Sequence, residues 1–184
     1  MSARILAAAS FAAAVHASHR RKGVAAEPYI NHPIEVALIL AEHDAAEAAI
    51  VAALLHDTVE DSDDDPEPVT LEALAERFGA EIAGIVAEVS DDKSLPKEMR
   101  KALQVSQAGK KSDAAKQVKL ADKISNLRAI VVAPPASWNH ARRVEYVGWA
   151  GRVAAGLRGV NPTLEALFDR TYQTAMAELA REAE

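Results

Sequence analysis

The chain has 184 residues, of which 49% are hydrophobic and 26% are charged, as in an ordinary globular protein. Its formal net charge of −6 argues against a general nucleic-acid-binding surface, which requires a basic excess. Cysteine is absent, which excludes a disulfide framework and a thiolate metal site. We therefore expect a small-molecule partner and no nucleic acid.

The alanine-rich N-terminal segment lacks the features of a signal peptide, because no basic stretch precedes a continuous run of bulky apolar residues. No apolar run is long enough to cross a bilayer. We expect no membrane association and a cytoplasmic location. The sequence makes no prediction of the oligomeric state.

Alanine dominates the apolar residues, and aromatic residues make up only 4% of the chain. This composition favours close-packed helices over a sheet of β-branched or bulky side chains. The sequence thus predicts an all-α fold in which residues 1–184 form a single domain of about eight to ten helices. We find no internal repeat and no interdomain linker.

In the N-terminal part, the first predicted helix covers about residues 3–19 and ends near Arg20. A basic loop follows, interrupted by residues that break helices: Gly23, Pro28 and Pro33. The segments IEVALILAEH and AEAAIVAALLHDTVED predict two further helices. The second ends in an acidic run, residues 60–67, which we expect to be a solvated loop.

In the C-terminal part, Thr70 is a predicted N-cap for LEALAERF, and Gly79 is the predicted end of that helix. Helical periodicity resumes in EIAGIVAEV, and DDKSLPKEM predicts a turn. The remaining predicted helices cover about residues 96–107, 113–131 and 139–157, and a last helix begins at Pro162 with Asn161 as its N-cap.

Two histidines and two aspartates form a dispersed set of candidate metal ligands: His32, His56, Asp57 and Asp122. Imidazole and carboxylate groups together suit a borderline-hard divalent cation. A cation with open coordination positions suits the hydrolysis of a phosphate ester. The set therefore predicts a metal-dependent phosphohydrolase.

Two acidic residues lie beside this set. Glu60 follows His56 by four residues and Asp61 follows Asp57 by four, which is one turn of a helix in each case. Such carboxyl groups can orient a water molecule or pass a proton to a leaving oxygen. The alternative is that they belong only to a helix end that runs into an acidic loop.

Basic side chains gather near these motifs and could hold an anionic substrate. Arg21 and Lys22 are favoured because they lie in the loop that leads to His32. Tyr146 follows Arg142 by one helical turn, so both could face one cleft.

His16 and His19 lie three residues apart on the first predicted helix. A second pair of metal ligands is conceivable there, but we do not expect one.

Several segments, in their order along the chain, resemble the HD-domain alarmone hydrolases. This family includes the hydrolase half of the SpoT and Rel proteins and the stand-alone small alarmone hydrolases. The segments span most of the chain and are RRK, PYINHP, ALLHDTVED, FGAEI, EVSDDKSLPK, KLADKISNLR and EYVGWA. The resemblance implies an all-α HD-domain helical bundle that holds one Mn²⁺ ion per chain.

The same resemblance implies roles for individual residues. The metal ligands would be His32, His56, Asp57 and Asp122, and the catalytic acid pair would be Glu60 and Asp61. Arg21 and Lys22 match the basic residues that flank the purine base, and Asn126 matches a polar residue that contacts the nucleoside. The residues that match contacts to the substrate phosphates are Lys97, Arg142 and Tyr146.

The implied reaction removes the 3′-pyrophosphate from guanosine 3′,5′-bis(diphosphate) (ppGpp) or its pentaphosphate analogue (pppGpp), leaving GDP or GTP. The residues alone support hydrolysis of some phosphorylated nucleotide, whereas guanine and the 3′ position rest on the resemblance. Because the chain ends after one domain, we expect no synthetase activity.

Several alternatives stay open. The same fold could act on the adenine analogue ppApp, remove the 2′-phosphate of NADPH, act as a general nucleotidase, or sense a nucleotide without catalysis. The GVAAE segment after Lys22 is more alanine-rich than the family pattern and leaves the base preference open.

Overall fold

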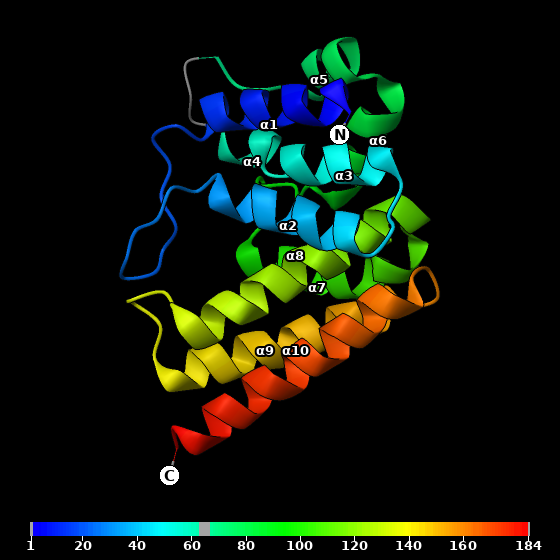
Figure 1. The fold of residues 1–184 in the computed structure, drawn as a ribbon. Coiled ribbons are helices and arrows are strands. Elements are labelled where there is room, and N and C mark those ends of the chain that lie inside the picture. The colour runs from blue at the N-terminus through cyan, green and yellow to red at the C-terminus, as the bar shows by residue number, and fades with distance from the viewer. Residues whose placement is uncertain (1, 63–66, 184) are drawn as a thin grey trace.

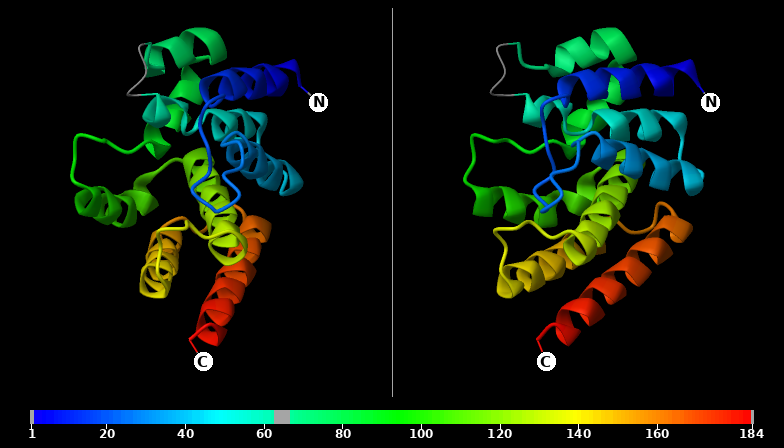
Figure 2. Two further views of the ribbon diagram at one scale, coloured as in Figure 1. Left: turned by 90° about the vertical axis from the view of Figure 1, so that its left-hand side faces the viewer. Right: turned by 60° about the vertical axis from the view of Figure 1, so that its left-hand side comes forward.

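The computed structural model describes residues 2–62 and 67–183 (Figures 1 and 2). In these ranges it contains α-helices, one 3₁₀ turn and two isolated β-bridges, and no strand. The helices are α1 (Ala3–Val15), α2 (Asn31–Glu42), α3 (Glu47–Leu55), α4 (Thr58–Asp61), α5 (Leu71–Phe78), α6 (Ala80–Val89), α7 (Lys97–Gln107), η1 (Ala108–Lys110), α8 (Asp113–Val132), α9 (His140–Ala155) and α10 (Pro162–Arg181). The predicted all-α fold is confirmed.

Part of the acidic run predicted as a solvated loop, residues 63–66, lies outside the described residues. Within the described ranges, no helix has both the length and the hydropathy needed to span a bilayer.

Two helices, α3 and α8, form the centre of the molecule. The helix α3 packs against α1, α2, α6 and α8, and α8 also contacts α9 and α10 (Figure 1). Six of the nine residues of α3 are buried, namely Ala49 and residues 51–55. The central position of these two helices matters for function because both carry, or lead directly into, predicted metal ligands.

Small side chains allow the helices to approach closely. Buried alanines occur on α1, α2, α3 and α8, at Ala8, Ala12, Ala37, Ala49, Ala52, Ala53, Ala115 and Ala121. The distance between two packed helices is set by the side chains at their contact, so alanine brings their axes together. The alanine-rich composition thus has a direct structural counterpart.

Several predicted helix ends are confirmed by side-chain caps. The hydroxyl of Thr70 accepts a hydrogen bond from the Ala73 N–H, and the side chain of Asn161 accepts one from the Leu164 N–H. Pro162 occupies the first turn of α10. Gly79 ends α5 with φ of 96°, a left-handed conformation that favours glycine.

The first helix is shorter than predicted, since α1 ends at Val15 rather than near residue 19. Backbone hydrogen bonds fold the following segment back on itself, from Arg21 N–H to Glu27 O and from Tyr29 N–H to His19 O. The resulting loop then docks on the segment after α8. A Cβ atom on Gly23 would lie 2.7 Å from the carbonyl oxygen of Ala133, so this close approach requires glycine.

The helix predicted over AEAAIVAALLHDTVED is interrupted at His56 and Asp57, which separates α3 from α4. Two side chains bond to carbonyl groups of the last turn of α3 and satisfy them in place of a continuing helix. His56 Nδ1 lies 2.7 Å from Ala53 O, and the hydroxyl of Thr58 donates to Leu55 O at 2.7 Å. The interruption leaves His56 and Asp57 at the junction between two helices.

Candidate active site

The structure brings the four predicted metal ligands together from three places in the chain. His32 is the second residue of α2, His56 and Asp57 lie between α3 and α4, and Asp122 lies on α8. Nε2 of His56 is 3.0 Å from Asp57 Oδ2, and Nε2 of His32 is 3.2 Å from Asp122 Oδ1. Nε2 of His32 is also 3.7 Å from Asp57 Oδ2, and Nε2 of His56 is 3.9 Å from Asp122 Oδ1.

The outer nitrogens of both imidazole rings are held by protein partners. The hydroxyl of Ser125 donates to Glu35 Oε2 at 2.7 Å, so it accepts from Nδ1 of His32 at 2.9 Å. Nδ1 of His56 donates to the carbonyl of Ala53. Burial acts to lower the pKa of His56, but Asp57 and Asp122 outweigh it and raise that pKa to about 9, so a metal ion that binds Nε2 takes the place of a proton there. The partners on Nδ1 fix the orientation of the two rings.

The inner atoms fit a divalent cation. Among the described residues, Nε2 of His56 is buried without a hydrogen-bond partner, although it lies 3.0 Å from the Asp57 carboxylate. Ligand atoms about 2.1 Å from a cation are separated from their neighbours by about 3 Å, which is close to the shortest distances here. His32, His56 and Asp57 each offer a ligand atom within 4.8 Å of the other two and can hold a divalent metal ion, and Asp122 lies beside both histidines.

The carboxyl groups of the site are in their charged form. Burial acts to raise the pKa of Asp57, but the neighbouring His56 and His32 outweigh it and lower that pKa below its ordinary value. Burial is likewise outweighed at Asp122, whose pKa is held well below its usual range by the ammonium of Lys123, 2.9 Å away, and by His32. Both groups are therefore available as anionic ligands at neutral pH.

A cavity of about 470 Å³ opens beside these residues. Its lining includes six residues predicted from the sequence to act in binding or catalysis, namely Arg21, Lys22, His32, Asp61, Asn126 and Tyr146. The volume lies in the range of small-molecule sites, roughly 300–1,000 Å³. The basic loop and one predicted metal ligand, His32, thus line one cavity.

Two predicted phosphate contacts are not among the lining residues. Arg142 lies with its guanidinium carbon 4.7 Å from the ring centroid of Trp138, and Lys97 is exposed at the start of α7. Within the described part of the chain, neither belongs to the cavity lining, whereas Tyr146 does. Arg142 stacks on Trp138, a lining residue whose ring centroid is 5.3 Å from that of Tyr146, so the expectation that Arg142 and Tyr146 face one cleft stays a prediction.

The two predicted catalytic acids point to different surroundings. Oε1 of Glu60 accepts a hydrogen bond from the backbone N–H of Asp91 at 2.8 Å, whereas Asp61 lines the cavity. Burial, together with the charge of Asp57, raises the pKa of Glu60 to about 7 despite the Asp91 N–H, which lowers it. Burial and the charge of Asp57 also raise the pKa of Asp61.

Several residues around the site were not singled out by sequence reasoning. They are Tyr29, Glu35 and Ser125, which bond to predicted ligands or to their partners. Tyr29 and Ser125 belong to the segments PYINHP and KLADKISNLR, which resemble the family. Each lies three residues from a predicted ligand, His32 or Asp122, and this spacing could have indicated their role. Glu35 has no comparable signal, because its role depends on α2 packing against α8.

A sequence model of the HD domain matches residues 8–150. The human guanosine-3′,5′-bis(diphosphate) 3′-pyrophosphohydrolase MESH1 is 50% identical over 93% of this chain and 94% of its own length. The Xenopus tropicalis MESH1 is 46% identical over 92% and 93%. A solved structure, described as a metazoan ortholog of SpoT that hydrolyses ppGpp, superposes with a TM-score of 0.88 at 41% identity and covers 95% of this chain and 96% of that one.

Fold and site together are those of an HD-domain protein with a histidine–aspartate cluster suited to a divalent metal. The chain belongs to the HD-domain family and, within it, to the branch of the stand-alone MESH1 enzymes. The resemblance seen in the sequence segments is confirmed.

Proposed function

We propose that this protein is a metal-dependent guanosine-3′,5′-bis(diphosphate) 3′-pyrophosphohydrolase, which converts ppGpp or pppGpp to GDP or GTP and pyrophosphate. One observation carries the proposal: His32, which lies within a cluster of two histidines and two aspartates, lines a cavity that Arg21 and Lys22 also line. Further support comes from the relatives that bear this activity in their names and match nearly the whole chain.

The proposed cofactor of this site is one Mn²⁺ ion, with His32, His56, Asp57 and Asp122 as its ligands. Mixed nitrogen and oxygen donors suit manganese and related divalent ions. When bound, such an ion supplies Lewis acidity and lowers the pKa of coordinated water. The orientation of His32 by Ser125 and of His56 by Ala53 supports the assignment, because both rings present Nε2 to the carboxylates.

Glu60 and Asp61 are proposed to handle protons. A group that exchanges a proton efficiently during catalysis has a pKa near the working pH. The pKa of Glu60, about 7, meets that condition. Asp61 lines the cavity, within which a carboxyl group can orient water or donate to the leaving pyrophosphate.

The substrate is proposed to bind with its purine base between Arg21 and Lys22 and with its nucleoside near Asn126. Nδ2 of Asn126 donates to Asp122 Oδ1 at 2.6 Å, which ties this part of the cavity to the proposed metal site. Tyr146 is the proposed phosphate contact that lines the cavity. The phosphate contacts of Lys97 and Arg142 stay predictions, because neither residue is among those that line the cavity.

The test compares hydrolysis of ppGpp by metal-free protein with hydrolysis by the same protein after Mn²⁺ is added back. The products are separated by anion exchange. We expect GDP and pyrophosphate only when the ion is present. Asp57→Ala should lose both metal retention and turnover, and the surface variant Asp169→Ala serves as its control. Turnover by metal-free protein, or full turnover by Asp57→Ala, would contradict the proposal.

The predicted cytoplasmic location stays a prediction that cell fractionation tests.

A further inference from the structure

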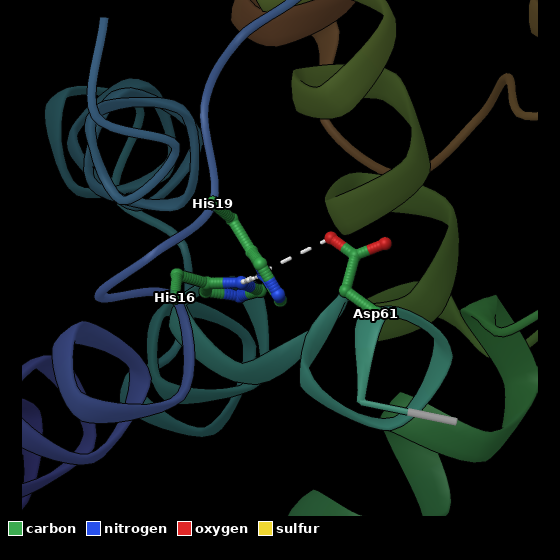
Figure 3. A group of neighbouring side chains, drawn as sticks. All are labelled: His16, His19 and Asp61. Atoms are coloured by element: carbon green, nitrogen blue, oxygen red, sulfur yellow. Dashed lines mark hydrogen bonds and ion pairs between the residues drawn. The ribbon is translucent and has the colours of Figure 1, made fainter. Parts of the chain in front are cut away.

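A second cluster of possible metal ligands lies outside the four residues assigned above (Figure 3). It consists of His16, which follows α1, His19 in the loop after it, and Asp61 at the end of α4. We propose that these three side chains form a second divalent cation site. The proposal rests on the geometry of the cluster itself and does not depend on the substrate proposed above.

The three side chains are close enough to share an ion. Nδ1 of His16 lies 3.1 Å from Nδ1 of His19 and 3.9 Å from Oδ2 of Asp61. One ligand atom from each residue lies within 4.8 Å of the other two. Figure 3 shows the two rings near each other with the Asp61 carboxylate facing them. The nitrogen–nitrogen distance matches the separation of about 3 Å between adjacent ligands of one cation.

His16 is in the chemical state that a ligand needs. Its side chain is buried, and burial lowers the pKa of the imidazole to about 4, even though the Asp57 charge acts to raise it. At neutral pH the ring is therefore uncharged and has a lone pair for a metal ion.

The polar contacts of His16 also point to a missing partner. Its Nδ1 faces both Nδ1 of His19 and Oδ2 of Asp61. A simple N–H···N bond between the two rings would account for the short distance alone. A shared cation would also account for the carboxylate turned toward them.

The ligand set defines the kind of ion. Two imidazoles and one carboxylate suit Mn²⁺, Fe²⁺, Co²⁺ or Zn²⁺ and leave coordination positions open. Asp61 also lines the substrate cavity. An ion at this place can therefore take an oxygen of a bound phosphate as a further ligand and, with Arg21 and Lys22, balance its negative charge.

One consequence rests on the proposed function. If Asp61 binds a cation, it is not free to exchange a proton, and the general acid or base role falls to Glu60 alone.

Counting bound ions tests the inference without any assay of activity. Free Mn²⁺ is measured by electron paramagnetic resonance while the protein is titrated with MnCl₂. We expect two ions per chain for the wild type, one for His19→Gln and two for the control His43→Gln, whose ring bonds to the backbone of α2. One ion in the wild type, or two ions in His19→Gln, would overturn the proposal.

A second measurement does not require a variant to fold. Crystals grown with Mn²⁺ should give two anomalous peaks per chain, one of them between His16, His19 and Asp61. A peak only at His32, His56, Asp57 and Asp122 would overturn the second site. If the protein binds one ion and hydrolyses ppGpp, the second site is wrong and the proposed function stands. If it binds two ions and does not hydrolyse ppGpp, the second site stands and the proposed function is wrong.

Discussion

The hydroxyl of Tyr29 donates a hydrogen bond to Oδ2 of Asp57 over 2.7 Å. The same oxygen lies 3.0 Å from Nε2 of His56. The centroid of the Tyr29 ring is 4.9 Å from that of His16 and 5.8 Å from that of His32. One side chain therefore orients a predicted metal ligand and contacts both histidine clusters.

Tyr29→Phe removes the hydrogen bond to Asp57 while keeping the ring between His16 and His32. Because partners of metal ligands fix their orientation, we expect the affinity for the first Mn²⁺ to fall by about 10–100-fold. Titration calorimetry measures this change, and Tyr172→Phe on α10 provides a control for the loss of a hydroxyl. An unchanged affinity would show that the Asp57 carboxylate needs no support from Tyr29.

Glu60→Gln keeps the shape of the side chain and an oxygen that can accept from the Asp91 N–H. We expect near-normal metal content, because Glu60 is not a proposed ligand, and a kcat lower by about 10²–10⁴-fold if its proton exchange is catalytic. Metal analysis and steady-state kinetics on the same sample separate the two effects. Full activity in this variant would rule out the assigned role.

The pH dependence of turnover should reflect the raised pKa of Glu60, about 7. If the carboxylate acts as a base, kcat rises as the pH increases through this value and then levels off. The rising limb should be missing from Glu60→Gln. A wild-type profile that is flat across neutral pH would count against a base with this pKa.

The same pKa predicts an effect on stability in the metal-free protein. Glu60 holds its proton more tightly in the folded state than in the unfolded state, whose value is near 4.5. The free energy of unfolding therefore loses a contribution as the pH rises from about 4.5 to about 7, and Glu60→Gln should lack this loss. Thermal unfolding across that range measures it. A variant with the same pH dependence as the wild type would contradict the shift.

Arg21→Ala should mainly raise KM, because Arg21 lines the cavity and its guanidinium lies 6.0 Å from the ring centroid of Tyr29. Arg142→Ala should have a smaller effect, since Arg142 is not itself a lining residue and its guanidinium stacks on the lining residue Trp138. We expect at least about a tenfold difference in KM between the two variants, the equivalent of one good charged contact. Equal KM values would contradict the assigned positions.

Local signals in the sequence were sufficient for the helical class and for many helix ends. Thr70, Gly79 and Asn161 act through bonds to residues close in the chain, so their roles are visible without the fold. The four candidate metal ligands were found because their residue types and recognised segments are specific.

Features that depend on distant packing were not predictable in this way. The first helix ends early because the loop after it folds back and docks beside Ala133. The contact of Glu60 with the Asp91 N–H joins residues 31 positions apart, so it depends on the docking of a distant segment. The approach of Asp61 to His16 joins residues far apart in the chain, and only the docking of α4 near the end of α1 creates it.

The most direct test of the central claim is a comparison of kcat/KM for ppGpp, ppApp, NADPH and GTP by the Mn²⁺-loaded protein, with every product separated by anion exchange. The account predicts that ppGpp is the best of the four substrates and yields GDP and pyrophosphate. Preference for ppApp or NADPH would contradict the proposed substrate, and no turnover of any of them by the metal-loaded protein would contradict catalysis itself.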